Sequence, residues 1–277
     1  MLKTGLSTCG RIPEEPLFRE YAEAGIEVME VSPNQGGYDM LDFAKLKKLG
    51  DTYGVELRSF HLQYYPFEQV DISSPDDALR RASVRRLCGQ IEKAAAAGIG
   101  IFVAHPGSEP IADSAREAHL AASCESFSEL AEFAQKAGGV IAAEDLPRTC
   151  PGHDSAEMLR LLAADERLRV CFDTNHLLRE DPADFVRAVG KKIITLHVSD
   201  YDLIDEKHWL PGEGKVDWQA LIAALADAGY NGAWTYELGF APPRTLKRAR
   251  DLTCADFVAN AKALFAGKTP ERIPLES

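Results

Sequence analysis

Long uncharged apolar segments are missing from this 277-residue sequence. No stretch approaches the roughly 18 such residues that a membrane-spanning helix needs, and the N-terminal MLKTGLSTCGRIPEE lacks the apolar core of a secretory signal. The six cysteines are scattered and form no CxxC pair, which favours reduced thiols over a disulfide framework or a zinc–thiolate site. We therefore expect a soluble, cytoplasmic protein without a membrane partner.

Positive charge is also scarce. The chain has 31 Lys and Arg against 43 Asp and Glu, and its formal net charge is −12. Such a surface repels a polyanion, and the short basic clusters at residues 80–86 and 244–250 fall on predicted helices, where they are better explained as solvated faces. No nucleic acid partner is expected. No GxGxxG follows the first predicted strand, which argues against dinucleotide binding. No GxxxxGK phosphate loop occurs either, so no motif supports a phosphorylated substrate.

What the chain does contain is a regular alternation of strands and helices. Eight segments are apolar at nearly every position, as strands covered on both faces are: residues 3–8, 26–32, 55–62, 99–105, 140–146, 169–173, 193–198 and 233–238. Helices are predicted at residues 15–24, 41–53, 75–97, 113–137, 155–164, 182–189, 217–228 and 245–265. Ser74-Pro75 and Asp181-Pro182 are expected to begin two of these helices.

Strict alternation implies parallel strands joined by crossover helices. Eight such units in a chain of this length predict a single-domain α/β protein with a closed (β/α)₈ TIM barrel. We expect the barrel to occupy residues 1–266 and a short C-terminal extension to occupy residues 267–277.

Six of the predicted strands end in histidine or a carboxylate. In chain order these residues are His61, His105, Glu144, Asp173 with His176, His197 with Asp200, and Glu237. The C-terminal ends of barrel strands share one mouth, where so many such groups would repel each other or stay unpaired unless a cation held them. Oxygen and imidazole donors suit Mn²⁺, Mg²⁺, Co²⁺ or Zn²⁺. The residues Glu144, Asp173, His197 and Glu237 can share one ion, whereas His61 and His105 fit the pocket wall equally well.

Several motifs resemble those of the xylose-isomerase-like barrel superfamily. They are FDTNH (residues 172–176), LHVSD (196–200), HWLPGEGKVDW (208–218) and YEL (236–238), and the resemblance runs from the first strand to the eighth. This superfamily includes sugar phosphate isomerases/epimerases, ketose 3-epimerases, hydroxypyruvate isomerases, inosose dehydratases and apurinic/apyrimidinic endonucleases.

In the epimerase branch, the resemblance implies one divalent ion, with Mn²⁺ the first choice, held by Glu144, Asp173, His197 and Glu237. The two glutamates would also be the acid/base pair. Arg148 matches a substrate-contacting arginine of that branch, although a surface-loop arginine is an equally good interpretation. The other candidates, His61, His105, His176 and His208, would contact the substrate or support the metal ligands.

The predicted function is that of a metal-dependent isomerase or epimerase acting on a small sugar, sugar phosphate or polyol. Removing a proton next to a carbonyl requires stabilisation of the enediolate, which a divalent ion provides. One glutamate would then take the proton and the other return it. The oligomeric state is left open, and a homo-oligomer is compatible with the sequence.

Two other enzyme classes use similar residues. A lyase like inosose dehydratase would use the same ion to expel water. The endonuclease branch holds three zinc ions, and His61, His105, Glu206 and His208 can be matched to its additional ligands alongside Asp173 and His176; the net charge of −12 counts against it. A barrel that only binds a ligand is a further alternative.

Overall fold

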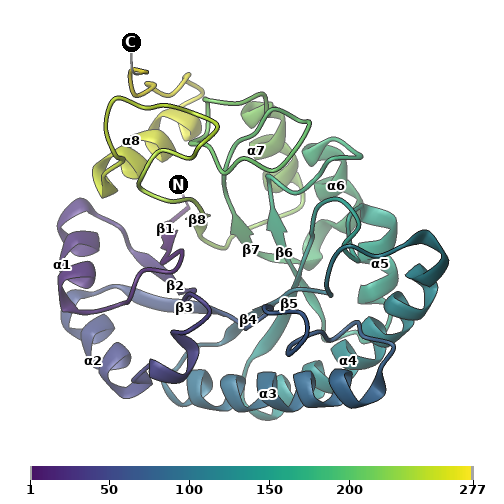
Figure 1. Ribbon diagram of the computed structural model, residues 1–277. Coiled ribbons are helices and arrows are strands. Elements are labelled where there is room, and N and C mark those ends of the chain that lie inside the picture. Colours follow the sequence, from purple (N-terminus) through teal and green to yellow (C-terminus); the bar gives the residue numbers. More distant parts are fainter. Residues whose placement is uncertain (1, 276–277) are drawn as a thin grey trace.

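Eight parallel strands stand side by side around a central barrel (Figure 1). The computed structural model describes residues 2–275, and its strands are β1 (Thr4–Ser7), β2 (Val28–Val31), β3 (Glu56–His61), β4 (Ile101–Ala104), β5 (Val140–Glu144), β6 (Arg169–Asp173), β7 (Ile193–His197) and β8 (Trp234–Tyr236). Their order is β7-β6-β5-β4-β3-β2-β1-β8. A bridge between Val198 and Tyr236 joins β8 to the end of β7, so the sheet returns on itself. The predicted (β/α)₈ barrel is confirmed.

The helices form an outer ring around the strands (Figure 1). They are α1 (Glu15–Ala24), α2 (Phe43–Tyr53), α3 (Asp77–Ala96), α4 (Arg116–Lys136), α5 (Ser155–Leu162), α6 (Pro182–Val189), α7 (Trp218–Asp227) and α8 (Cys254–Phe265). Gly25 ends α1 with a φ of 85°, in the left-handed region that glycine adopts without strain. Within residues 2–275, no helix combines the length and the apolar composition that crossing a membrane requires.

The barrel strands carry two apolar layers and one polar layer. Outward side chains such as Phe102 and Phe172 pack under the helices in the main core, whereas Val103, Ala142 and Cys171 form a small cluster inside the barrel. Side chains two residues apart on a strand point to the same face. The polar residues that follow the inner cluster by two positions, which are His105, Glu144 and Asp173, therefore lie directly above it, at the C-terminal mouth.

Strand register places further polar residues in the same layer. Asp173 of β6 pairs directly with His197 of β7, and Glu30 of β2 pairs with Ser59 of β3. The sheet thus brings side chains from distant parts of the chain to one level of the barrel.

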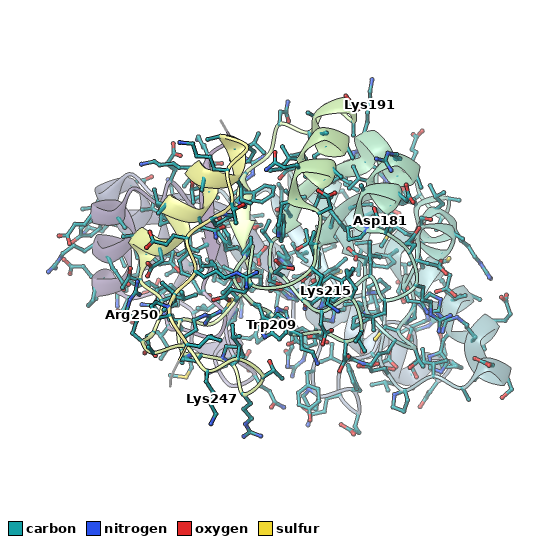
Figure 2. All side chains as sticks on the ribbon, turned by 90° about the horizontal axis from the view of Figure 1, so that it is seen from above. Asp181, Lys191, Trp209, Lys215, Lys247 and Arg250 are labelled. Carbon is teal, nitrogen blue, oxygen red and sulfur yellow. The ribbon has the colours of Figure 1, made fainter. Side chains whose placement is uncertain are left out.

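Two predicted helix boundaries were wrong. Residues 245–253 do not extend α8, because they bond to other segments: the Arg248 side chain pairs with Glu213 at 2.7 Å, and the Ala249 N–H donates to the carbonyl of Pro274 at 2.8 Å. In Figure 2 this stretch is a loop that carries Lys247 and Arg250 on its outer side. The α3 helix begins at Asp77 rather than after Ser74, since its N-cap is the carboxylate of Asp76.

The predicted start of α6 was correct. Asp181 caps the helix by accepting a hydrogen bond from the Ala183 N–H, and Pro182 occupies the first turn. Near the C-terminus, Ile273 is buried and Leu275 pairs with Arg248. The division into a barrel of residues 1–266 and a C-terminal extension stays a prediction.

Candidate metal centre and active site

Four side chains converge at the centre of the barrel mouth. Glu144, Asp173, His197 and Glu237 each present one nitrogen or oxygen atom, and these atoms all lie within 4.8 Å of one another. The Nδ1 atom of His197 is 2.9 Å from Oε1 of Glu144, 3.2 Å from Oε2 of Glu237 and 3.9 Å from Oδ2 of Asp173. The ends of β5, β6 and β7 and the residue after β8 supply this set.

The residues present fit a divalent ion. Oδ2 of Asp173 is buried and has no hydrogen-bond partner within the described residues, and an unsatisfied buried carboxylate oxygen is costly. Three carboxylates and one imidazole provide the hard oxygen and nitrogen donors that Mn²⁺, Mg²⁺, Co²⁺ and Zn²⁺ accept. An ion between these groups would give Oδ2 of Asp173 a partner and offset the repulsion among the carboxylates.

The ionisation of the three carboxylates reflects the same crowding. Burial raises the pKa of Asp173 to about 7, against the opposing effect of His176. Burial acts in the same direction on Glu237, but the positive charge of His197 outweighs it and holds the pKa of Glu237 at about 2. The pKa of Glu144 is also well below its usual range, because the charges of His197 and His105 outweigh its burial. Both glutamates are therefore ionised at neutral pH.

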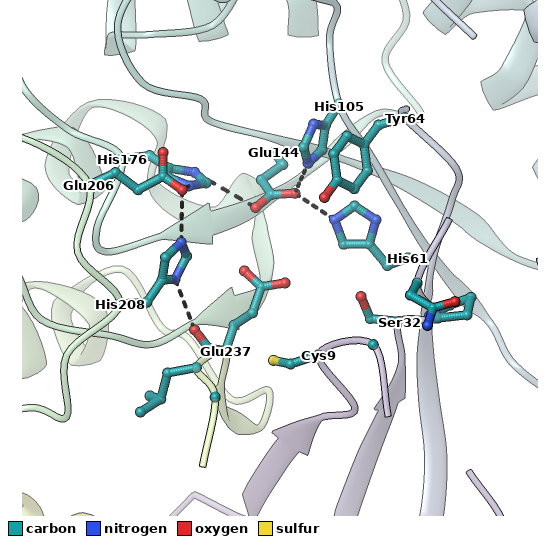
Figure 3. Close-up of a pocket in the computed structure, with 15 residues that line it drawn as sticks. Cys9, Ser32, His61, Tyr64, His105, Glu144, His176, Glu206, His208 and Glu237 are labelled. Atoms are coloured by element: carbon teal, nitrogen blue, oxygen red, sulfur yellow. Dashed lines mark hydrogen bonds and ion pairs between the residues drawn. The ribbon is translucent and has the colours of Figure 1, made fainter. Parts of the chain in front are cut away.

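His61 and His105 meet the outer oxygen of Glu144 (Figure 3). Each presents Nε2 at 3.2 Å from Oε2 of Glu144, and the Tyr64 ring stacks on His105 with centroids 4.0 Å apart. The pKa of His61 rises to about 9, since its hydrogen bond to Glu144 outweighs the cost of burial, whereas burial lowers the pKa of His105. The two predicted histidines thus lie at the site and brace one of its carboxylates.

A second cluster lies beside the first and contains His176, Glu206 and His208. Oε1 of Glu206 is 2.8 Å from Nε2 of His208 and 3.8 Å from Nε2 of His176 (Figure 3). His176 comes from the FDTNH motif after β6, and the other two lie on the loop after β7. The Asn175 side chain ties that loop down by accepting from the Lys207 N–H at 2.9 Å.

Arg148 lies at the rim and is not among the residues that line the cavity. Its guanidinium pairs with Glu109 at 2.6 Å, Asp205 at 3.2 Å and Glu206 at 3.0 Å. Arg148 therefore fixes the outer oxygen of Glu206 and links three loops, and contact with a substrate stays a prediction. Its φ of 54° puts a non-glycine residue in the left-handed region, where the surrounding ion pairs hold it.

Sequence reasoning missed three buried polar residues around the site. Glu30 interrupts the apolar run VMEV of β2 and bonds to His197 at 2.8 Å. Asp145, next to Glu144, accepts the Asp173 N–H at 2.7 Å, and its backbone carbonyl is 2.8 Å from Nδ1 of His176. Asn175 was part of a motif but had no role assigned. A charged residue inside an apolar strand was the available signal for Glu30.

Asp200, which ends LHVSD, does not enter the cavity. Its carboxylate accepts from the Gly212 N–H at 2.8 Å and from Nε1 of Trp218 at 2.9 Å, so it anchors the PGEG loop. A Cβ on Gly214 would lie 2.2 Å from Oδ1 of Asp200, which explains the glycine at that position. This loop packs beside the segment that carries Arg248.

The two clusters open into a cavity of about 440 Å³, within the usual range for small-molecule sites. It is lined by Cys9, Gly10, Ser32, Pro33, Asn34, His61, Tyr64, His105, Glu144, His176, Glu206, His208, Glu237, Leu238 and Gly239. The loops after β1 and β2 supply a wall without ionised groups, and the carboxylates and imidazoles form the opposite wall and the floor. No lysine or arginine is among these lining residues.

Comparisons with known proteins identify the family and agree with the fold. Residues 18–254 match the family model described as xylose isomerase-like TIM barrel. Fructoselysine 3-epimerase of Shigella flexneri is 27% identical over 257 residues, covering 86% of this chain and 90% of the relative. A D-tagatose 3-epimerase-like protein superposes with a TM-score of 0.79 at 23% identity over 96% of each chain. D-psicose 3-epimerase from Clostridium cellulolyticum, solved with D-tagatose, gives a TM-score of 0.73 at 20% identity over 87% of this chain and 86% of its own.

Proposed function

The chain belongs to the xylose isomerase-like TIM barrel family, and from this premise we propose that it is a divalent-metal-dependent epimerase or isomerase of a ketose. One observation carries the proposal: Glu144 and Glu237, from separate strands, meet Asp173 and His197 around one point on the floor of a sugar-sized cavity. The named relatives that act as sugar 3-epimerases support epimerisation at carbon 3.

Glu144, Asp173, His197 and Glu237 would hold the ion. When bound, it would polarise the substrate carbonyl and stabilise the negative charge that develops as the adjacent carbon loses its proton. This requirement explains why acidic and imidazole groups, rather than thiols, occupy the position.

The two glutamates differ in their surroundings, as an acid/base pair requires. Both Glu144 oxygens are engaged, Oε1 by His197 at 2.9 Å and Oε2 by His61 and His105 at 3.2 Å each. The Glu237 side chain is 15% exposed, against 1% for Glu144, and it meets His197 at 3.2 Å. Because β5 and β8 are not neighbours in the barrel, the two carboxylates approach a substrate from different sides, so one can remove a proton and the other return it to the opposite face.

The lining of the cavity favours an unphosphorylated substrate. A phosphate group is normally met by arginine, lysine or a helix N-terminus, and neither lysine nor arginine lines this cavity. Ser32 and Asn34 after β2, Tyr64 after β3 and backbone groups of the β1 and β2 loops are suited to sugar hydroxyls. We therefore propose a free ketose or a ketose joined to an uncharged or cationic group.

The test is carbon–proton exchange by the metal-loaded enzyme in deuterated water, using a panel of ketoses and inososes. Glu144→Gln and Glu237→Gln keep the side-chain size and an oxygen atom but remove basicity. Each variant should lose net conversion by about 10²–10⁴-fold, while one of them retains exchange from a single face. If the wild type exchanges no carbon-bound proton in any ketose, the epimerase proposal fails. Loss of water from an inosose would instead identify a lyase.

A second candidate is a multi-zinc phosphoesterase, favoured by one observation. His176, Glu206 and His208 form a separate cluster within 4.8 Å, and His61 and His105 flank Glu144. Elemental analysis of the purified protein discriminates: about one ion per chain supports the epimerase, and about three support the phosphoesterase. His208→Ala should leave the metal content unchanged in the first case and remove an ion in the second.

A further inference from the structure

Glu30 is a buried carboxylate that the proposed chemistry does not use. It sits on β2 among apolar neighbours, and its exposure is 0%. Its Oε1 lies 2.8 Å from Nε2 of His197, and its Oε2 accepts the hydroxyl of Ser59 at 2.8 Å. A buried charge of this kind is stable only when its hydrogen bonds are satisfied, and both oxygens of Glu30 are.

The two ring nitrogens of His197 face opposite sides. Nε2 faces Glu30, while Nδ1 faces the carboxylates of Glu144 at 2.9 Å and Glu237 at 3.2 Å. An ionised carboxylate can only accept hydrogen bonds. Both ring nitrogens therefore face acceptors in the absence of an ion. With an ion on the Nδ1 side, Nδ1 would give its lone pair to the ion, and the single proton of the neutral imidazole would lie on Nε2 and be donated to Glu30.

Ser59 completes this arrangement from the next strand. Glu30 and Ser59 are register partners on β2 and β3, so the backbone ladder fixes their separation. Because the Ser59 hydroxyl occupies Oε2, Oε1 is the oxygen that remains for His197. The line Ser59–Glu30–His197 thus crosses the barrel interior from β3 to β7 and ends at the metal centre.

Resting on the metal-dependent function proposed above, we propose that Glu30 is a positioning residue, which holds His197 in the Nε2-protonated tautomer and aims Nδ1 at the divalent ion. Glu30 touches neither the ion nor the substrate in this role. A carboxylate that orients a metal-binding histidine raises the basicity of that ligand, and losing such a partner usually lowers metal affinity about 10–100-fold.

Three variants distinguish this positioning role from effects of lost charge or impaired folding. Glu30→Met keeps the chain length but removes the acceptor, and Glu30→Gln keeps an acceptor while removing the charge. Glu27→Gln makes the same charge change at an exposed site just before the same strand and is the matched control. Circular dichroism and thermal melts report whether each variant folds.

The first measurement is the dissociation constant for Zn²⁺ and Co²⁺, from competition with a chromogenic chelator. Glu30→Met should weaken binding about 10–100-fold, Glu30→Gln less, and Glu27→Gln not at all. The second is a long-range ¹H–¹⁵N correlation spectrum of Zn²⁺-loaded, ¹⁵N-histidine protein, with His197→Asn for assignment. In the wild type, Nε2 of His197 should carry the proton and Nδ1 should show the shift of a metal-bound nitrogen.

Glu30→Met should alter the His197 pattern, and Glu30→Gln should largely preserve it. If Glu30→Met binds both ions as tightly as the wild type with an unchanged His197 pattern, the positioning role is overturned and the proposed function stands. If the wild type binds no divalent ion, the proposed function and this role fall together. Should Glu30→Met not fold, Glu30→Gln with wild-type affinity and a proton on Nδ1 would overturn the role equally.

Discussion

The carboxylate of Asp173 lies where it costs folding free energy unless a ligand contacts it. Its Oδ1 accepts the Asn175 N–H at 2.7 Å, but its Oδ2 is buried without a hydrogen-bond partner in the described part of the chain. The surrounding carboxylates and the loss of solvent disfavour its charge. A group held in this state is a cost to the fold unless a ligand offsets it.

Asp173→Asn should therefore separate the free-energy cost of this buried charge from the stabilisation that a bound ion would give. In metal-free protein the variant should be as stable as the wild type or more stable by about 1–3 kcal/mol, since it removes an unsatisfied buried charge. With Mn²⁺ added, the wild type should gain much more stability than the variant, which lacks one ligand charge. Urea unfolding with and without the ion measures both effects, with Asp227→Asn at an exposed position as the control. A metal-free variant that is markedly less stable would contradict this account of Asp173.

At the scale of elements, α8 begins at Cys254, directly after its N-cap Thr253, rather than at residue 245, where the sequence predicted it. The Asp256 carboxylate accepts from the Thr253 N–H at 2.7 Å and from its hydroxyl at 2.8 Å, and it pairs with Arg250 at 2.7 Å. These contacts, the Arg250 hydrogen bond foremost, lower the pKa of Asp256 to about 2. The Asp256 carboxylate thus joins the N-terminus of α8 to the loop at residues 245–253.

Removing this cap should have an effect that depends on pH. Asp256→Ala should destabilise the protein by about 1 kcal/mol near neutral pH. The pKa of Asp256 is lowered from 3.8 to about 2 on folding, so its contribution is fully present above about pH 4 and is lost as the pH falls toward 2. Unfolding free energies of wild type and variant should therefore converge as the pH falls from about 4 to about 2. Asp251→Ala, in the same loop, should show no such convergence.

For the whole molecule, the candidate ion would join four strands that follow one another around one half of the barrel, β5, β6, β7 and β8. A ligand that binds only the folded chain stabilises it by mass action, by about 2.7 kcal/mol at a hundredfold excess over its Kd. In a chain of 277 residues that corresponds to a Tm increase of roughly 5 °C.

Chelation should reverse this stabilisation. Dialysis against EDTA should lower the Tm of the wild type by several degrees, and Mn²⁺ should restore it. Asp173→Asn, which lacks one ligand charge, should respond weakly to either treatment. Differential scanning calorimetry provides the measurement. A wild-type Tm that is the same with EDTA and with Mn²⁺ would argue against a resident ion.

The barrel and the polar character of its mouth could be predicted from local patterns in the chain. Alternating apolar strands and glycine-ended helices are local signals, and they predicted the eight units, the family and the isomerase or epimerase class that the relatives support. Because parallel barrel strands all end at one mouth, Glu144, Asp173, His197 and Glu237 can be grouped from the sequence alone.

Which side chains contact each other depends on the folded arrangement of the elements. Glu30 and His197 are 167 residues apart, and only closure of the barrel brings β2 across from β7. The same holds for Arg148, whose partners lie on two other loops. It also holds for residues 245–253, whose hydrogen bonds go to Glu213 and to the carbonyl of Pro274 near the C-terminus. Local patterns are set by neighbouring residues, whereas these contacts depend on the relative positions of elements that are distant in sequence, which only packing defines.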